Sequence, residues 1–255
     1  MKQGLLASLL LAIALAPPLA RAQAAAPPPS TSSTAVDPAA IQALKDMGAY
    51  LQGLSRFRVS TELTGERVLA DGQKLQHTAS AVIDVARPNR LRARMSSARS
   101  VRELFYDGRQ ATLYSPAQKY YSTVEFSGSL AELVDRLEQR YGVEVPLADL
   151  FLWGTAAAPA DGIESAMNAG QDFIGGDLCD HFALRQGKLD WQIWIEAGGK
   201  PLPRKLVITN RADEARPQSV SLIEWQLKPG FPDSIFTFVP SKGSKSVELR
   251  ALDRN

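Results

Sequence analysis

The sequence has little of the material from which nucleophilic and metal sites are built. Its 255 residues include one cysteine and two histidines. A single cysteine excludes an internal disulfide. The cysteine and the two histidines together lack the paired spacing of zinc ligands. No G-x-S-x-G motif precedes a helix pattern, and no glycine-rich loop leads from a strand into a helix. The sequence therefore predicts neither an α/β-hydrolase nucleophile nor a phosphate-binding loop.

The few residues of this kind have simpler structural explanations. His77 lies on the apolar face of a predicted strand, and His181 follows Asp180 near a turn. Any Ser-His-Asp set would have to be assembled by the fold from one of these two histidines. Cys179, next to Leu178, is predicted to be a half-buried strand residue, with a reactive thiol as the alternative. We predict no catalytic residue, no metal site and no cofactor.

Long apolar runs and net charge are also missing. The N-terminal apolar run, residues 5–16, has about a dozen residues, whereas a membrane-spanning helix needs roughly 20. It follows Lys2 and is followed by small residues ending at Ala22, which predicts a cleaved signal peptide over residues 1–22. Its removal, with Lys2 and Arg21, reduces the 29 basic residues to 27, equal to the 27 acidic ones. A neutral mature chain gives no electrostatic reason to expect nucleic-acid binding.

The composition changes after the leader. Residues 23–36, QAAAPPPSTSSTAV, carry no charge and are rich in Ala, Pro, Ser and Thr, which predicts a disordered tether because they cannot bury enough apolar area. Asp37 and Pro38 then supply a helix N-cap and a first helical residue. Apolar residues recur at helical spacing for about four turns and predict one amphipathic helix. We assign residues 37–255 to a single domain.

From Phe57 onward the apolar period changes to two, which is typical of strands. Alternating segments joined by tight turns predict six consecutive antiparallel strands between residues 57 and 126. A helical insertion at about 129–155 follows, with a capping box at Ser129 and Glu132 and a very apolar segment near its end. The alternation then returns and predicts strands at 166–174, 177–186, 188–196, 202–211, 218–228 and 233–239, with a short one at 247–251.

This order of elements predicts a mainly β (α+β) fold with one antiparallel sheet of about 11–13 strands. A sheet of that size curls, because large flat sheets are uncommon. One face of the strands is consistently apolar, and the insertion and the first helix can cover it. The alternation leaves open whether the covered face is a packed core or encloses a cavity.

If there is a cavity, its lining comes from inward apolar residues of the strands and of the insertion. The candidate ligand-binding residues are Val59, Leu63, Ile83, Met95, Phe105, Leu133, Leu150, Phe151, Trp153, Trp191, Ile193 and Ile195.

One hairpin has large side chains on both faces. Residues 190–209, DWQIWIEAGGKPLPRKLVIT, predict two strands joined by a turn at AGGK. Trp191, Ile193 and Ile195 share one face, which we assign to the concave side. Trp194 lies on the other face and needs a cover of its own, from the first helix or from a partner.

The sequence has one basic row, Arg90, Arg92 and Arg94, whose side chains point to the same side of a predicted strand. The row can contact an anionic partner or a lipid headgroup. It can also be a solvated row that faces acidic residues of the neighbouring strand, such as Asp84.

The hairpin at 190–209, together with IEWQLKPGFPDSIFTFVPSKGSKSVEL downstream, resembles an uncharacterised family of predicted periplasmic bacterial proteins. That family is similar in turn to the LolA/LolB-like superfamily of lipoprotein carriers. The segment DSIFTFVPSKG at 233–243 is similar to the F-x-F-x-P-P-x-G strand ending of the superfamily, with Ser241 in place of the second proline. The resemblance covers most of residues 38–250.

The resemblance implies an unclosed antiparallel half-barrel in the periplasm, with helices plugging its concave side and a hydrophobic cavity for acyl chains. It does not match any arginine of this chain to the residue that latches the lid of a lipoprotein carrier. The superfamily also contains periplasmic sensors that bind a membrane regulator, which implies a membrane-anchored periplasmic partner as one option.

The resulting functional hypothesis is a periplasmic, non-enzymatic binding or carrier protein for a lipid or a lipidated protein. The alternative is an envelope-stress sensor or protein-interaction module with a filled core, acting through an edge strand or through the arginine row. An unrecognised hydrolase is a third interpretation, and it would have to use one of the two histidines.

Overall fold

The computed structural model describes residues 35–252. The predicted signal peptide and the predicted tether up to residue 34 lie outside them. Twelve strands form a single sheet in the order β12-β6-β5-β4-β3-β2-β1-β11-β10-β9-β8-β7. The strands are β1 (Arg56–Val68), β2 (Lys74–Ala86), β3 (Arg90–Ser96), β4 (Val101–Tyr106), β5 (Gln110–Ser115), β6 (Tyr120–Glu125), β7 (Ile163–Ile174), β8 (Asp177–Gln186), β9 (Leu189–Glu196), β10 (Pro203–Asn210), β11 (Gln218–Leu227) and β12 (Lys245–Ser246).

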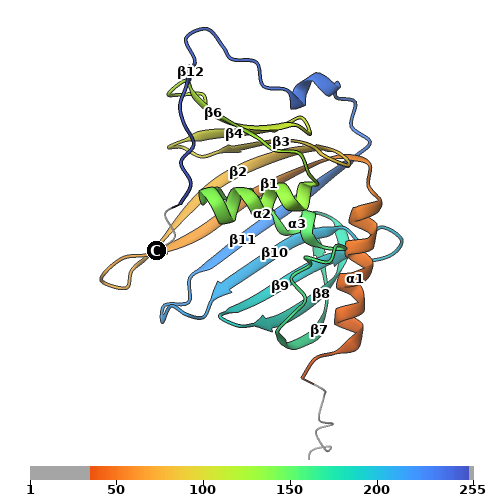
Figure 1. The fold of residues 1–255 in the computed structure, drawn as a ribbon. Coiled ribbons are helices and arrows are strands. Elements are labelled where there is room, and N and C mark those ends of the chain that lie inside the picture. The colour runs from red at the N-terminus through yellow and green to blue at the C-terminus, as the bar shows by residue number, and fades with distance from the viewer. Residues whose placement is uncertain (1–34, 253–255) are drawn as a thin grey trace, which may run out of the picture. The chain divides into compact units, whose positions relative to one another are not determined.

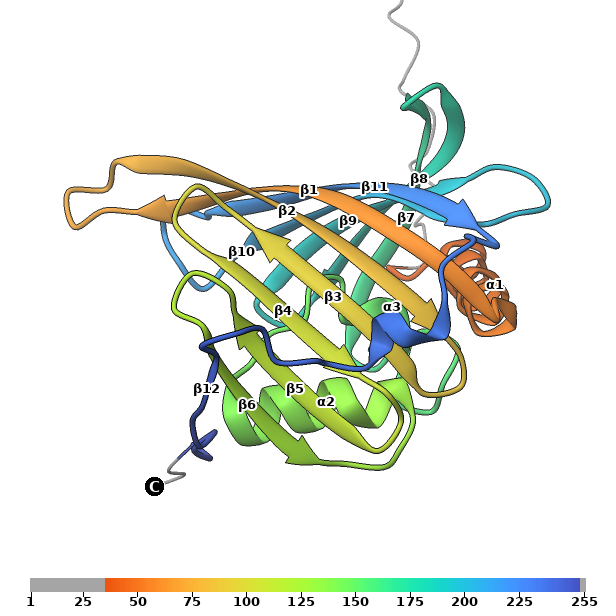
Figure 2. The same cartoon turned by 90° about the horizontal axis from the view of Figure 1, so that it is seen from above.

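The sheet is an open antiparallel half-barrel, as the alternation and the resemblance predict. Every neighbouring pair is antiparallel except β12 with β6, and β12 and β7 remain as separate edges. The first and second meanders join in the middle, where β1 pairs with β11 over nine consecutive residue pairs from Phe57–Leu227 to Gly65–Ser219. Figure 2 shows the curl of the sheet, with β4, β5 and β6 turned over α2.

Three α-helices accompany the sheet: α1 (Pro38–Gly53), α2 (Leu130–Tyr141) and α3 (Asp149–Leu152). α1 and α2 begin at the N-terminal capping residues that the sequence predicts. Asp37 accepts a hydrogen bond of 2.8 Å from the amide of Ala39, and Ser129 and Glu132 form a complete capping box. Gly142 ends α2 in the left-handed region at φ 63°, where glycine carries no steric penalty. α2 and α3 lie in front of the sheet and α1 runs beside β7 (Figure 1).

The core lies between the helices and the concave face of the sheet. One continuous cluster joins concave-face residues such as Val59, Ile83 and Leu91 to the buried faces of the helices, including Leu44 and Leu137. These five side chains have at most 1% of their surface exposed. Burying each is worth about 1.5–3 kcal/mol, so the helices are fixed by apolar packing more than by their caps.

The close approach of α1 to the loop after α3 depends on glycine. A Cβ added to Gly48 would lie 2.6 Å from the amide nitrogen of Gly154. Gly154 has φ 80°, a conformation that other residues adopt only under strain. The two glycines therefore let the backbones touch and set where Trp153, the residue between α3 and Gly154, is held.

The predicted strands at 233–239 and 247–251 are wrong in detail. Residues 228–252, here called the C-terminal strap, contain a 3-10 turn, η1 (Asp233–Phe236), and the two-residue β12. The strap crosses the convex face of the sheet, where Phe238 packs on Phe105, Tyr114 and Tyr121 at ring-centroid distances of 5.3, 5.0 and 5.0 Å. The packing on the convex face explains why aromatic residues alternate along the strap. An extended segment that lies on a sheet has the same period-two pattern as a strand within the sheet, so the pattern does not distinguish the two.

Candidate functional site

The first candidate site is an apolar pocket between α3 and the concave face of β9, β10 and β11. Its volume is about 160 Å³. The period-two alternation of the strands brings large apolar side chains to the same face, and α3 adds two more from the opposite side. The walls are formed by Trp191 and Ile193 of β9, Leu206 and Ile208 of β10, Ile223 of β11, and Leu150 and Trp153 beside α3.

Two tryptophans in the wall of this pocket pack on each other. The ring centroids of Trp153 and Trp191 are 6.2 Å apart, with 46° between the ring planes. The backbone carbonyl of Trp153 accepts a hydrogen bond of 2.7 Å from the side-chain amide of Gln52 in α1. α1 therefore fixes the α3 side of the pocket through this hydrogen bond and through the Gly48–Gly154 contact.

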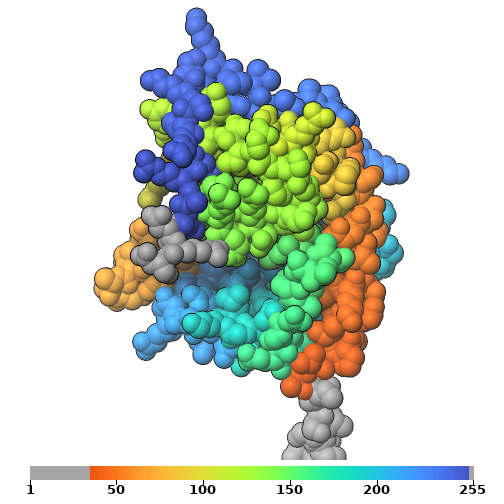
Figure 3. Space-filling view, viewed as in Figure 1, coloured from red at the N-terminus to blue at the C-terminus, as the bar shows by residue number. Residues whose placement is uncertain are grey.

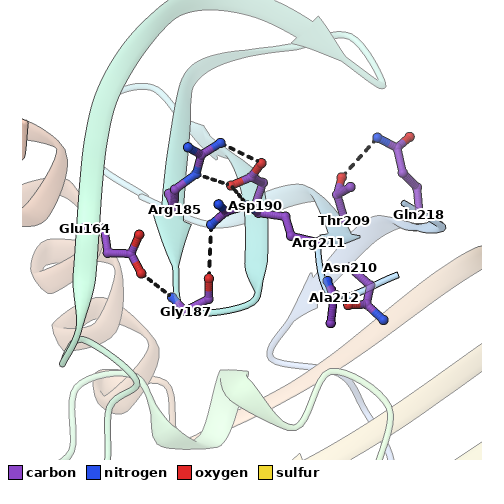
Figure 4. A network of polar contacts seen from close by, with 9 residues as sticks. All are labelled: Glu164, Arg185, Gly187, Asp190, Thr209, Asn210, Arg211, Ala212 and Gln218. Atoms are coloured by element: carbon purple, nitrogen blue, oxygen red, sulfur yellow. Dashed lines mark hydrogen bonds and ion pairs between the residues drawn. The ribbon is translucent and has the colours of Figure 1, made fainter. Parts of the chain in front are cut away.

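The rim of the pocket at the β8–β9 turn is held by polar contacts (Figure 4). The amide of Gly187 donates to Glu164 at 3.0 Å, and its carbonyl accepts from Arg211 at 3.0 Å. Arg185 and Asp190 form a two-point ion pair across the turn at 2.7 and 3.0 Å. These contacts fix the turn that carries Gln186 and Leu189, two further residues of the pocket wall.

Asp149, at the start of α3, is the one acidic residue in the wall of the pocket. The residue is exposed to solvent, although protein atoms lie around much of its carboxyl group. This desolvation, with the nearby Glu138 carboxylate, raises the pKa of Asp149 above its ordinary value. Within residues 35–252 no hydrogen bond or ion pair reaches its carboxylate. The other polar residue, Gln186, already donates its amide to the carbonyls of Pro159 at 3.1 Å and Asp161 at 2.6 Å.

A second apolar pocket, of about 380 Å³, lies further along the concave face. Leu63, Met95 and Leu113 line its sheet side, and the segment 142–147 lines the other. Leu147 belongs to the walls of both pockets and separates them. On the concave side the molecule is visibly hollowed between α2 and the blue strands β10 and β11 (Figure 3).

The predicted lining residues divide between pockets and packed core. Leu150, Trp153, Trp191 and Ile193 line the first pocket, and Leu63 and Met95 line the second. Five others are buried in the core with at most 4% of their surface exposed, namely Val59, Ile83, Leu133, Phe151 and Ile195. The concave face is thus mostly filled, with two pockets left on either side of Leu147.

Phe105 is a correction, because it lies on the convex face. Its neighbours Leu104 and Tyr106 belong to the concave core, whereas Phe105 packs on Phe238 of the C-terminal strap. The β4 sequence Leu-Phe-Tyr is apolar on both faces, so periodicity could not assign the face.

Sequence reasoning missed several wall residues of the first pocket. They are those of β10 and β11, and Met47, Leu147, Asp149, Pro159, Gln186 and Leu189. Leu206 and Ile208 pair directly with Ile193 and Trp191, so the predicted hairpin already implied that they share the concave face. Asp149 could have been noticed as a lone acid in the apolar run PLADLFLWG. Nothing in the local pattern signals the position of Leu147.

Trp194, on the convex face, is covered by side chains of neighbouring strands and not by the first helix. The ring of His181 stacks on it with a centroid distance of 4.0 Å and 9° between the planes. The ammonium of Lys205 lies 4.3 Å from the indole centroid. The indole N–H donates to Asp172 at 2.8 Å. The expectation that the first helix covers Trp194 was therefore wrong, because neighbouring strands supply the cover.

Cys179 lies beside Trp194 in a small convex cluster and is fully buried. Burial raises the pKa of the thiol and disfavours the reactive thiolate. Of its two interpretations, the structural one fits this environment.

The arginine row is paired within the chain. Arg92 and Arg94 both contact Glu103 of β4, and Arg90 contacts Asp233 of the strap. Asp84, the expected partner, is bound instead by Arg58, at 2.6 and 3.1 Å. The row therefore faces neighbouring acids, as its second interpretation expects.

No helix within residues 35–252 is long and apolar enough to cross a bilayer. Across the same part of the chain, no three His, Cys, Asp or Glu side chains are grouped so that they could hold a metal ion.

Solved structures that are similar to this chain are distant in sequence. LprF from Mycobacterium bovis is 12% identical, with 77% of this chain and 96% of that chain covered and a TM-score of 0.45. A LolA superfamily protein from Nitrosomonas europaea is also 12% identical, with 78% and 97% covered and a TM-score of 0.37. MucB, solved in complex with MucA(peri), is 12% identical, with 75% and 57% covered and a TM-score of 0.40.

No curated protein sequence matches the chain significantly. A family model described as "Predicted periplasmic protein (DUF2092)" matches residues 40–250, which include every element from α1 to β12 except the first two residues of α1. The match agrees with the periplasmic location that the sequence resemblance implies. The chain belongs to this family of periplasmic proteins, DUF2092.

Proposed function

We propose that the protein is a non-enzymatic periplasmic binding or carrier protein for a lipid or a lipidated protein, with an apolar chain held in the pocket under α3. The observation that carries this proposal is the pocket itself. Its wall consists of apolar side chains apart from Asp149 and Gln186, and it includes two tryptophans. Ligand pockets are typically apolar with a few polar groups that fix orientation.

A chain longer than the first pocket would continue into the second. Leu147 lines both pockets, which have volumes of about 160 and 380 Å³. Leu147 has φ 54°, in the left-handed region, where a residue with a Cβ is strained by about 1–2 kcal/mol. Releasing this strain would offset part of the cost of moving the segment, so residues 142–148 are the part of the cover that we expect to rearrange around a long chain.

The test is to purify the mature protein from cells, extract it with organic solvent, and identify bound lipid by mass spectrometry. Two variants sharpen it. Ile208→Phe fills the first pocket from β10, whereas Leu222→Phe adds the same volume on the solvent side of β11. We expect stoichiometric lipid in the wild type and in Leu222→Phe, and much less in Ile208→Phe. Absence of lipid from all three, with no uptake of a fluorescent fatty alcohol, would overturn the proposal.

The alternative, an interaction module, is favoured by the free edge of β7. Ala166 of this strand bridges to Val36, but from Met167 onward no described strand pairs with its outer edge. Phe173, near the end of the strand, has 74% of its surface exposed. An extended segment of another protein would add to this edge, and Phe173→Lys should block it because charge at an edge opposes strand addition. Loss of a cross-linked periplasmic partner in Phe173→Lys, with lipid content unchanged, would favour this alternative.

A further inference from the structure

Asp149 gives the pocket under α3 a chemical preference that apolar walls alone would not have. Asp149, the first residue of α3, is exposed to solvent at the wall of the pocket, and the other wall residues are apolar apart from Gln186. Gln186 uses its amide hydrogens on the carbonyls of Pro159 and Asp161, so this neighbour does not supply a donor. Within the described residues, the carboxylate has no hydrogen-bond or ion-pair partner of its own.

The charges around the pocket oppose an anionic ligand end. No lysine or arginine lies in the wall, and the nearest charged group acting on Asp149 is a second carboxylate, Glu138. A fatty-acid carboxylate or a phosphate placed here would meet like charge in a partly desolvated site. A hydroxyl or an ammonium would instead donate to the free carboxylate, and hydrogen bonds to a charged acceptor are the stronger ones.

The second pocket differs in this respect. Its wall includes Arg102 together with Glu103 and Glu144, so it carries charges of both signs. Among the described residues, the wall of the first pocket has an acid and no base.

We propose, building on the binding function above, that the pocket under α3 selects an aliphatic chain ending in a hydrogen-bond donor, a hydroxyl or an amine, and discriminates against carboxylate and phosphate ends. Asp149 is the residue that sets this specificity. It contacts the end group of the ligand and leaves the chain to the tryptophans and aliphatic walls.

The experiment compares decanol, decylamine and decanoate as competitors of the neutral dye Nile red at about pH 8, where a free carboxylic acid is ionised. We expect decanol and decylamine to displace the dye and decanoate to be weaker by about tenfold or more. Asp149→Asn keeps the size of the side chain and removes its charge. In this variant decylamine should displace the dye less well than in the wild type, and decanoate should displace it about as well as decanol does. Glu144→Gln, in the wall of the second pocket, is the matched control and should leave the ranking unchanged. Asp149→Ala serves as a second variant should Asp149→Asn not fold.

Each outcome decides between the two proposals. Equal displacement by all three compounds, unaltered in Asp149→Asn and Asp149→Ala, would overturn the specificity and leave the binding function standing. Decanoate as the strongest competitor would overturn it as well. Failure of Nile red itself to bind, with no lipid extracted from the purified protein, would overturn the binding function and the specificity with it.

Discussion

Gly48 in α1 is the residue at which the first helix meets the loop that carries Trp153. A Cβ at this position would lie 2.6 Å from the nitrogen of Gly154, 3.0 Å from its Cα and 3.1 Å from the carbonyl carbon of Trp153. All three atoms belong to backbone, so the clash cannot be relieved by a rotamer change. Overpacking of this kind costs about 1–3 kcal/mol. Alanine is the better helix former by about 1 kcal/mol, so the two effects oppose each other.

We expect Gly48→Ala to lower the free energy of unfolding by up to about 2 kcal/mol net, which corresponds to a fall in Tm of up to roughly 8 °C for a domain of this size. Gly53→Ala is the control in the same helix. No described atom beyond the chain neighbours of Gly53 lies within 4 Å of a Cβ built there. This control should be neutral or more stable by up to about 1 kcal/mol.

Urea denaturation of both variants, followed by tryptophan fluorescence, measures the difference. The emission of Gly48→Ala should also shift in the native state, because Trp153 must move with the loop. Equal stability of the two variants, with equal native spectra, would refute the claim that backbone contact at Gly48 holds the α3 side of the pocket in place.

Two further predictions concern single polar groups. The pKa of Asp149 is raised in the folded chain, so the unfolded chain loses this proton first as the pH rises, and stability falls between the ordinary carboxyl range and the raised value. Asp149→Asn should therefore gain stability relative to the wild type across that pH range, and a stability difference independent of pH would contradict this. The hydroxyl of the fully buried Tyr106 donates to the carbonyl of Gly128 at 2.7 Å and accepts from its amide at 3.0 Å. Tyr106→Phe should lower the free energy of unfolding by about 1–3 kcal/mol in a urea titration, with the exposed Tyr120→Phe near zero.

Much of the sheet could be predicted from local pattern. The meander between residues 57 and 126 and the hairpin at 190–209 have period-two alternation and clear turns, and each formed as expected. The capping box at Ser129 located the start of α2 because the two side chains that make it are three residues apart. These features depend on residues that are close together in the sequence, so the local sequence pattern is enough to predict them.

The misassigned parts depend on contacts between distant segments. Phe105 and Phe238 are about 130 residues apart in the sequence and pack on each other. The local pattern assigns Phe105 to the concave face and Phe238 to a strand, and only the path of the strap over the convex face corrects both assignments. Trp194 required knowledge of which strand lies beside β9, since His181 comes from β8. The division of the concave face into core and pockets depends on how closely α3 approaches the sheet, and Asp149 acquires its environment only from that approach.

The join between β1 and β11 has a consequence for folding. These strands begin at Arg56 and Gln218, so the central seam of the sheet is made by segments at opposite ends of the domain. A chain that folds from its N-terminus can build β1 to β6 as successive hairpins, and later β7 to β11, before the seam can close. Pairing over such a sequence distance is slow to form. We therefore expect one edge of β1 to stay unpaired until β11 has formed.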